Sequence, residues 1–308
     1  MMSVRSLSAV TLGMMLSVSG LHADCQGQEF QRSLTQLTFH QEFDYYPSWS
    51  PDGNWIVFSS SRDGGNLWKV PAGGGPAVQV TDFNSNHPSW SPDGSLIAFD
   101  SDGGSILKVV SSDGGVPVRI VPDSIVMSRG AHPCWSRDGT KVAFSAEGDV
   151  WMVDLPTGKL TLLFQDAGYY ARAFSWSPDD RYISADVGGD VEKADDDVWL
   201  LPVEGGEPIA LTSLPGREGN PKYSPDGSMI VFMSDPGTGD TRTLMVIPSS
   251  GGEPVSITTW QGFNANPRFS PDGRRIAFSS DRNGNPDIWM MELDLEALKE
   301  ALGIRKDH

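Results

Sequence analysis

Acidic residues recur along this chain at a spacing that first suggests acid–base chemistry. Six aspartates follow Ser-Pro or a close variant of it, at positions 52, 93, 138, 179, 226 and 272, in steps of 41, 45, 41, 47 and 46 residues. Acid–base catalysis needs two carboxyl groups in different environments, whereas these six share one local sequence. Their repetition indicates turn chemistry, and we predict no catalytic role for them.

Two histidines are the next candidates. His87 and His132 stand at matching places in consecutive repeats, and imidazole is a common ligand of zinc and similar ions. No third ligand stands at the matching position of another repeat, so the set is incomplete. We therefore predict no transition-metal site and no cofactor.

An acidic hairpin over residues 186–197 is a second candidate for a cation. Its carboxylates and carbonyls are ligands that Ca²⁺ accepts, but their spacing is not that of an EF-hand loop. A solvated hairpin is favoured, with calcium as the alternative. The sequence also contains no Gly-x-Ser-x-Gly elbow and no Gly-x-x-x-x-Gly-Lys phosphate loop.

A repeated β motif must position all of these residues. The stretch Tyr46–Gly53 returns as 87–94 and 132–139, and weaker copies follow at 174–180, 220–227 and 266–273. One β motif about every 40–45 residues is typical of propeller blades. Its Ser50-Pro51-Asp52-Gly53 corner has the residue preferences of a type I turn between two strands. Six copies predict an all-β, six-bladed β-propeller with four antiparallel strands per blade.

The first repeat predicts strands at 47–50, 55–59, 67–70 and 77–81. The second strand is apolar at consecutive positions, as in Ile56-Val57-Phe58, which indicates burial on both faces. Eight of the ten tryptophans fall on two repeat positions: 49, 90, 135 and 176 on the first strand, and 68, 151, 199 and 289 on the third. That regularity predicts a packing layer rather than an aromatic binding box.

The last repeat supplies only three strands before residue 294. Residues 34–39 resemble the end of a fourth strand, as in Gln79-Val80-Thr81. We therefore expect the N-terminal strand to complete the sixth blade, because an unpaired edge invites aggregation. Residues 294–303 predict a short helix that ends at Gly303 and docks through its leucines.

The beginning of the chain has the features of a secretory signal. Arg5 precedes an apolar run over residues 9–21, and Ala23 suits cleavage. The run is short for a membrane span, although a retained anchor is the alternative. We predict a signal peptide at 1–23, a linker at 24–33, the propeller at 34–294 and a helical tail at 295–308, in a periplasmic or secreted protein.

Charge and cysteine content limit the partners. Without residues 1–23 the chain has 40 acidic and 22 basic residues, a net charge of −18. Such a surface repels nucleic acid and anionic lipid, so we predict neither as a partner, and we expect a monomer. Cys25 and Cys134 form no disulfide framework. Cys134 is predicted to be a small buried residue, with a bridge to Cys25 as the alternative.

The pattern x-Pro-x-Trp-Ser-Pro-Asp-Gly, continued by Ile-Ala-Phe-x-Ser-Asp-Arg and Asp-Ile-Trp, resembles the WD40-like repeats of TolB-type β-propellers over about residues 34–294. The resemblance implies a six-bladed propeller closed by its N-terminal strand, of a family whose periplasmic member in the Tol–Pal system binds the peptidoglycan-associated lipoprotein. TolB also carries an α/β domain before the propeller, for which only about ten residues remain after the predicted cleavage site. We therefore expect a stand-alone TolB-like propeller.

The residue before each repeated motif varies from copy to copy. In a propeller these entry residues ring one mouth of the central channel, and we predict a binding site made of Tyr46, His87, His132, Arg172, Asn220 and Asn266. Their groups offer hydrogen-bond donors and acceptors. The alternative is that they only solvate a water-filled channel.

Three functions are compatible with this site. We predict a non-enzymatic propeller of the cell envelope or exterior that binds a protein or peptide, or serves as a scaffold. One alternative is a metal-dependent polysaccharide lyase or hydrolase using the two histidines, as in related propellers of pectate-fragment lyases. The other is an accessory propeller for a separately encoded catalytic or Tol-type partner.

Deleting residues 30–40 is predicted to destabilise the whole ring. The deletion would remove the strand that closes the sixth blade and leave the edge of that blade unpaired. Thermal denaturation should show a lower melting temperature for the truncated protein. An unchanged melting temperature would contradict closure by this strand.

Overall fold

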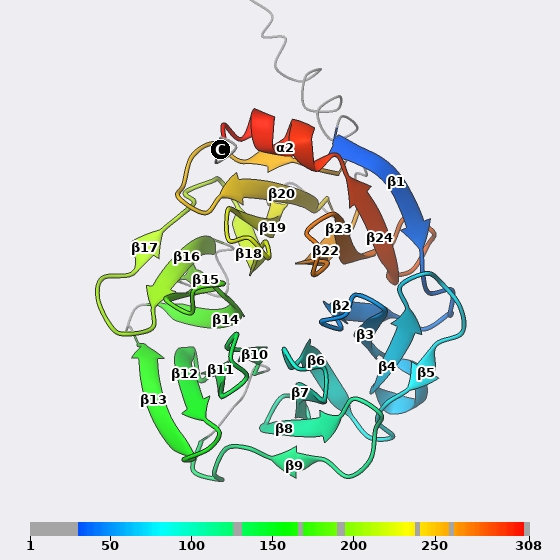
Figure 1. The fold of residues 1–308 in the computed structure, drawn as a ribbon, viewed down its shortest axis with the longest axis vertical. Helices are drawn as coiled ribbons and strands as arrows, with labels where there is room; N and C mark the ends of the chain where they lie inside the picture. The colour runs from blue at the N-terminus through cyan, green and yellow to red at the C-terminus, as the bar shows by residue number, and fades with distance from the viewer. Residues whose placement is uncertain are drawn as a thin grey trace, which may run out of the picture.

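The computed structural model describes residues 30–125, 131–165, 169–189, 195–237, 241–258 and 262–304. The predicted signal peptide and Cys25 lie outside the described residues. In the described part, 24 strands form six four-stranded antiparallel sheets, and Figure 1 shows them arranged as a ring. The predicted all-β, six-bladed propeller is confirmed.

Strands within a blade follow one another from the channel outward (Figure 1). Blade one comprises β2 (Asp44–Trp49), β3 (Trp55–Ser60), β4 (Asn66–Pro71) and β5 (Val78–Gln79), with the 3₁₀ turn η1 (Arg62–Gly64). Blade two comprises β6 (Ser85–Trp90), β7 (Leu96–Ser101), β8 (Ile106–Ser111) and β9 (Val118–Arg119). Blade three comprises β10 (Cys134–Trp135), β11 (Lys141–Ala146), β12 (Asp149–Asp154) and β13 (Lys159–Phe164).

The other three blades repeat this order. Blade four comprises β14 (Tyr170–Trp176), β15 (Tyr182–Gly188), β16 (Asp197–Pro202) and β17 (Ile209–Ala210). Blade five comprises β18 (Arg217–Tyr223), β19 (Met229–Asp235), β20 (Thr243–Pro248) and β21 (Val255–Ser256). Blade six comprises β22 (Asn264–Phe269), β23 (Arg275–Ser280), β24 (Asp287–Leu293) and β1 (Gln31–Gln36), and it is followed by the helix α2 (Leu295–Ala301).

Two boundaries in blade one differ from the prediction. The innermost strand β2 begins three residues earlier than expected, at Asp44, where it pairs with Ser60. The outermost strand β5 has two residues rather than five, and both are exposed. An outer strand has no neighbour on its far side, so fewer contacts hold it in an extended ladder.

The first-to-second-strand corners have the predicted turn chemistry. The Gly53 N–H donates to the Ser50 carbonyl at 2.9 Å, and the Ser50 hydroxyl donates to the Asp52 carboxylate at 2.5 Å. This bond from Ser50 and the backbone N–H of Asn54 lower the pKa of Asp52. Gly53 has a φ of 72°, which glycine adopts without a steric penalty. The repeated aspartate therefore serves as a turn acceptor.

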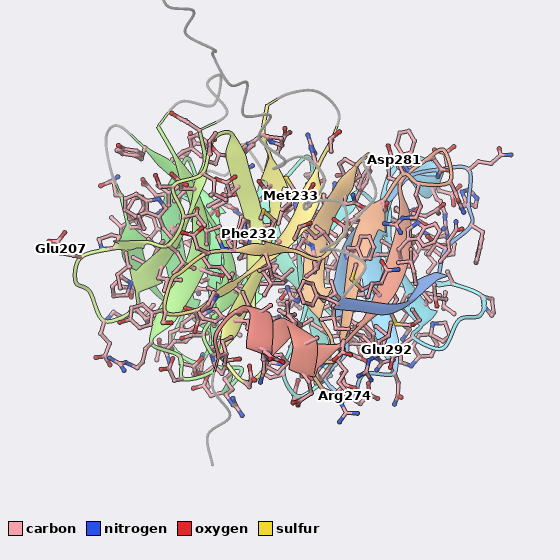
Figure 2. All side chains as sticks on the ribbon, turned by 90° about the horizontal axis from the view of Figure 1, so that it is seen from above. Glu207, Phe232, Met233, Arg274, Asp281 and Glu292 are labelled. Carbon is pink, nitrogen blue, oxygen red and sulfur yellow. The ribbon has the colours of Figure 1, made fainter. Side chains whose placement is uncertain are left out.

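The two ends of the blades form two different faces of the molecule. Figure 2 shows Asp281, of a second-to-third-strand hairpin, at one end, and Arg274, of a corner, at the other. The innermost strands begin on the same face as the second-to-third-strand hairpins. In blade one, for example, Asp44 at the start of β2 pairs with Ser60, which lies next to the hairpin. The predicted site and the corner aspartates are therefore on opposite halves of the channel.

The core lies between neighbouring blades. The second strands are buried along almost their whole length, and the phenylalanines at one matching position are fully buried: Phe58, Phe99, Phe144, Phe232 and Phe278. In three blades the opposite residue on the third strand is a predicted layer tryptophan, as for Phe58 with Trp68. Burial on both faces of the second strand is confirmed.

The tryptophans of the innermost strands also join one blade to the next. The indole N–H of Trp49 donates to the carbonyl of Arg268 at 3.1 Å, across the junction of blades one and six. Trp135 and Trp176 donate in the same way to the preceding blade, at 2.9 and 3.0 Å. The predicted packing layer is thus also a hydrogen-bonded seam between innermost strands.

The N-terminal strand closes the ring, as predicted. Strand β1 pairs antiparallel with β24, with Leu34 opposite Met291, and forms the outer strand of blade six (Figure 1). It spans Gln31–Gln36, three residues earlier than the expected 34–39. Helix α2 then packs on the ring through the buried Leu298, and Lys299 forms an ion pair with Asp226 at 2.6 Å.

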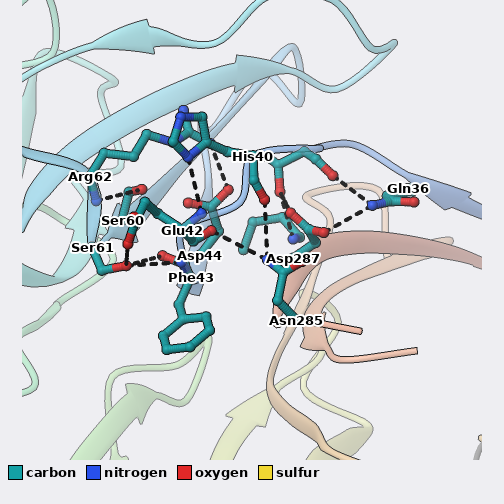
Figure 3. Close-up of polar contacts among 12 residues, drawn as sticks. Gln36, His40, Glu42, Phe43, Asp44, Ser60, Ser61, Arg62, Asn285 and Asp287 are labelled. Carbon is teal, nitrogen blue, oxygen red and sulfur yellow. Dashed lines mark hydrogen bonds and ion pairs between the residues drawn. The ribbon is translucent and has the colours of Figure 1, made fainter. Parts of the chain in front are cut away.

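Polar contacts fix the junction between blades six and one (Figure 3). The Asp287 carboxylate accepts hydrogen bonds from Thr38 and Gln36, both at 2.9 Å. On the blade-one side, Arg62 forms an ion pair with the buried Asp44 at 2.8 Å. Burial raises the pKa of Asp287 to about 6 despite the Thr38 hydrogen bond, and the nearby charge of Asp44 adds to the rise.

The substitution Asp287→Asn tests this junction. Because the native pKa lies above the unfolded value near 4, the folded state takes up a proton between about pH 4 and 6, and its stability falls as the pH rises through 6. The variant lacks this titration. Its free energy of unfolding, relative to the wild type, should therefore rise by about 1–3 kcal/mol from pH 4 to pH 7 in urea denaturation. Glu292→Gln, an exposed site on β24, is the control. A difference independent of pH would contradict the assignment.

Candidate functional site

A β-bulge interrupts the innermost strands at the predicted site positions. In blade one, Tyr45 pairs with Ser59 and Ser48 with Val57, so Tyr46 and Pro47 together face one residue of β3. The same irregularity occurs in blades two, five and six. A bulge turns a side chain away from the regular alternation of a strand.

The residues at these positions share an unusual backbone conformation. Their φ angles are positive: 55° for Tyr46, 51° for His87, 44° for His132, 56° for Asn220 and 55° for Asn266. This left-handed region costs a non-glycine residue about 1–2 kcal/mol, and a following proline restricts it further. Such strain is concentrated at functional sites. Five of the six predicted site residues therefore carry the same local strain.

The five side chains converge in the central channel. They line one cavity of about 30 Å³, together with the prolines that follow three of them and with Phe174, Lys222 and Arg268. This volume holds roughly one or two water molecules. The side chains therefore nearly fill the channel at this level.

One side of the channel is an aromatic wall, formed by Tyr46, His87, His132 and Phe174. Neighbouring ring centroids are 4.2 Å apart for Tyr46 and His87, 3.9 Å for His87 and His132, and 5.0 Å for His132 and Phe174. Phe174 takes the place that proline has in the other repeats. The sequence prediction missed it because it considered only the residue before the proline position and not that position itself.

The two imidazoles are in different environments. The ring nitrogen Nδ1 of His87 lies 2.6 Å from the carboxylate of Asp100, which also accepts the backbone N–H of Ala131 at 2.8 Å. Burial lowers the pKa of His132 well below its usual value, and the neighbouring His87 and Arg172 lower it further. His132 is therefore a neutral ring at pH 7.

The opposite side of the channel is polar. The side-chain amide of Asn266 donates to Asn220 at 3.1 Å, and the Ser279 hydroxyl donates to Asn266 at 3.3 Å. Next to the two asparagines lie Lys222 and Arg268, which the sequence prediction also missed. A signal was present: these two stand in the repeat column that holds Ser48, Ser89, Cys134 and Ser175 in the other blades.

Arg172 differs from the other five predicted residues. It forms ion pairs with Asp186 at 2.9 Å and with Asp196 at 3.1 Å, and it does not line the channel cavity. Both carboxylates are buried. Asp196 also pairs with Arg217 at 2.5 Å. Two carboxylates of the acidic hairpin thus neutralise arginines, whereas its residues 190–194 lie outside the described residues.

Aromatic side chains continue from the cavity to the rim of the channel. Tyr45 lies 6.3 Å from Tyr46, 5.8 Å from Phe263 and 6.1 Å from Phe43, measured between ring centroids. Phe43 is 47% exposed, and Figure 3 shows its ring pointing away from the polar junction. A run of contacting rings therefore leads from the surface into the channel.

Two other features of the described residues bear on function. They contain no cluster of three His, Cys, Asp or Glu side chains that could hold a metal ion. Within the same ranges, no helix has the length and apolarity needed to cross a bilayer. Cys134 is free and buried, as predicted for a small strand residue, and burial raises the pKa of its thiol to about 11. Its alternative pairing with Cys25 involves a residue outside those ranges.

These features define a six-bladed propeller whose channel is lined by residues that differ between blades. Residues 175–302 match the family model of the TolB β-propeller domain, and the described residues fold as a six-bladed propeller. The comparison with curated proteins found no match.

Solved structures share the fold at low sequence identity. A protein described as TolB from Agrobacterium tumefaciens has a TM-score of 0.64 and 21% identity, covering 84% of this chain and 96% of that one. TolB from Acinetobacter baumannii has a TM-score of 0.62 and 17% identity, covering 82% and 63%. An oligogalacturonate lyase in complex with manganese has a TM-score of 0.57 and 18% identity, covering 86% and 95%. Proteins named TolB and an enzyme therefore share this fold.

The neutral His132 predicts a pH effect on stability. Its pKa is lower in the folded than in the unfolded chain, so below about pH 6.5 only the unfolded chain gains this proton and stability falls. His132→Phe keeps a ring in the aromatic wall and removes the titration. From pH 7 to pH 5, urea denaturation should show the wild type losing about 1–2 kcal/mol more than the variant. His40→Gln, at an exposed site, is the control, and parallel pH profiles for wild type and His132→Phe would refute the claim.

Proposed function

We propose that this chain is a non-enzymatic binding propeller that takes a protein or peptide segment at the channel mouth. The observation that carries the proposal is the run of aromatic rings from the exposed Phe43, through Tyr45 and Tyr46, to His87 and the rest of the aromatic wall. A solvent-filled channel needs no such run.

The two sides of the channel suit different parts of a peptide. Aromatic rings bury large apolar areas and have few rotatable bonds, which is why they dominate binding hot spots. The amides of Asn220 and Asn266 offer donors and acceptors of the kind that a peptide backbone requires. We propose that apolar side chains contact the aromatic wall and that backbone groups bond to the asparagines.

Arg172 belongs to this proposal as a positioning residue. Its ion pairs with Asp186 and Asp196 hold the entry of blade four beside His132, whose pKa it affects. Replacing it would leave two buried carboxylates without a partner, which is costly in stability. Variants that test binding are therefore better chosen at the rim.

The proposed setting is the cell envelope or exterior. It rests on the predicted signal peptide at 1–23, on the division into linker, propeller and helical tail, and on the likeness to TolB propellers. The net charge of −17 disfavours nucleic acid and anionic lipid as partners, and we propose a monomer.

Selection from a random peptide display library tests the function. Peptides enriched on the wild-type protein should bind Phe43→Ala at least about five-fold more weakly, because truncation of an aromatic hot-spot residue costs more than 1 kcal/mol. Phe39→Ala is the matched control, since Phe39 is a 75% exposed phenylalanine outside the aromatic run. Fluorescence anisotropy measures the dissociation constants.

Two results would contradict the proposal. One is equal binding by Phe43→Ala and Phe39→Ala. The other is a stoichiometric transition metal in the purified protein that is lost on replacing His87 and His132, which would favour the lyase or hydrolase alternative.

A further inference from the structure

Two cations lie inside the channel of this acidic protein. Lys222 on β18 and Arg268 on β22 come from adjacent blades and occupy the repeat position after the bulge proline. Both line the cavity below the aromatic wall, and both also line a second pocket of about 190 Å³, here called the corner pocket. They therefore stand between the two halves of the channel.

Neither Lys222 nor Arg268 has an acidic partner among the described residues. In the described part of the chain, no carboxylate forms an ion pair with Lys222 or Arg268. The Lys222 ammonium donates to the carbonyl of Phe174 and lies 5.0 Å from the centre of its ring. Basic side chains this deep in a protein are ordinarily paired with an acid. Their unpaired state is the feature that a ligand would explain.

The protein environment disfavours the charged forms of Lys222 and Arg268. Burial lowers the pKa of Lys222 well below its usual value, and the charge of Arg268 lowers it further, whereas Cys134 and Asp186 have the opposite, smaller effect. Burial also lowers the pKa of Arg268. Both residues are nevertheless only half-buried, and both line the channel cavity. An anion placed there would reverse the repulsion.

The corner pocket has further features of an anion site. Its rim includes Arg137, which replaces the proline of the other five corners, and no Asp or Glu is among its lining residues. Ser89, 1% exposed, also lines it, and the Ser89 hydroxyl has no hydrogen-bond partner in the described residues. Three cations and one unused hydroxyl thus converge from four different blades.

We propose that the corner pocket binds an oxyanion, a carboxylate or a phosphate group, between Lys222 and Arg268. The ligand enters from the corner side, past Arg137, and the Ser89 hydroxyl donates a hydrogen bond to it. The pocket volume suits a small acid or the charged end of a longer molecule. The corner pocket shares Lys222 and Arg268 with the channel cavity, but it opens on the face opposite to the aromatic run, and the proposal does not depend on peptide binding.

Thermal denaturation in different anions tests the site. Acetate and citrate form the carboxylate arm and inorganic phosphate the other arm, each compared with chloride at equal ionic strength. A ligand at 100 times its dissociation constant should raise the wild-type melting temperature by about 5 °C, and the rise should saturate. The arm that saturates at the lower concentration identifies the group.

Three variants at the pocket are compared with one control. Lys222→Met and Arg268→Met should each weaken the anion at least ten-fold. Arg137→Met replaces an exposed side chain and should weaken anion binding several-fold. This variant still tests the proposal if Lys222→Met or Arg268→Met does not fold. Arg274→Met removes an exposed arginine on the same face and should leave the effect unchanged (Figure 2).

Two outcomes overturn the proposal. One is the absence of a saturable shift in either arm. The other is an equal shift in the wild type and in the three pocket variants, which would show a general salt effect. Phe43→Ala should retain anion binding, and Arg137→Met should retain binding of the selected peptides, so failure of one site is distinguishable from failure of the other.

Discussion

The whole structure depends on closing a ring of sheets that are apolar on both faces. The second strand of each blade is buried on both sides, so no blade can end at solvent without exposing core residues such as Phe58 or Phe278. Pairing of β1 with β24 meets this requirement, and the contacts of Asp287 and Arg62 hold the junction. The side chains can meet in the channel only when the ring is closed.

Ring closure places six innermost strands around one axis, and the bulge in those strands creates the site. A regular strand would alternate its side chains between the two neighbouring blades. The positive φ of Tyr46, His87 and their counterparts turns these residues toward the axis instead. Five blades supply one such residue each, and blade four supplies Phe174, which stands in the place of the proline. The residues that line the channel therefore differ from blade to blade.

Much of the fold and part of the site could be predicted from the sequence. The corner motif identified the number of blades, because Ser, Asp and Gly form that turn through contacts within five residues. The variable column before the proline identified five residues that line the channel. The sequence did not predict contacts between distant residues. Arg172 is held by Asp186 and Asp196 of the acidic hairpin. The indole of Trp49 donates to a carbonyl of the neighbouring blade.

The sequence by itself determined the strands, the corners and the order of the blades, because hydrophobic alternation and turn preferences act over a few residues. Only the tertiary structure decided which side chains meet in the channel. Lys222 and Arg268 are 46 residues apart in the sequence and look like ordinary strand positions. Their shared pocket and the absence of a carboxylate from its lining follow from the packing of blades around an axis, and no local pattern encodes that arrangement.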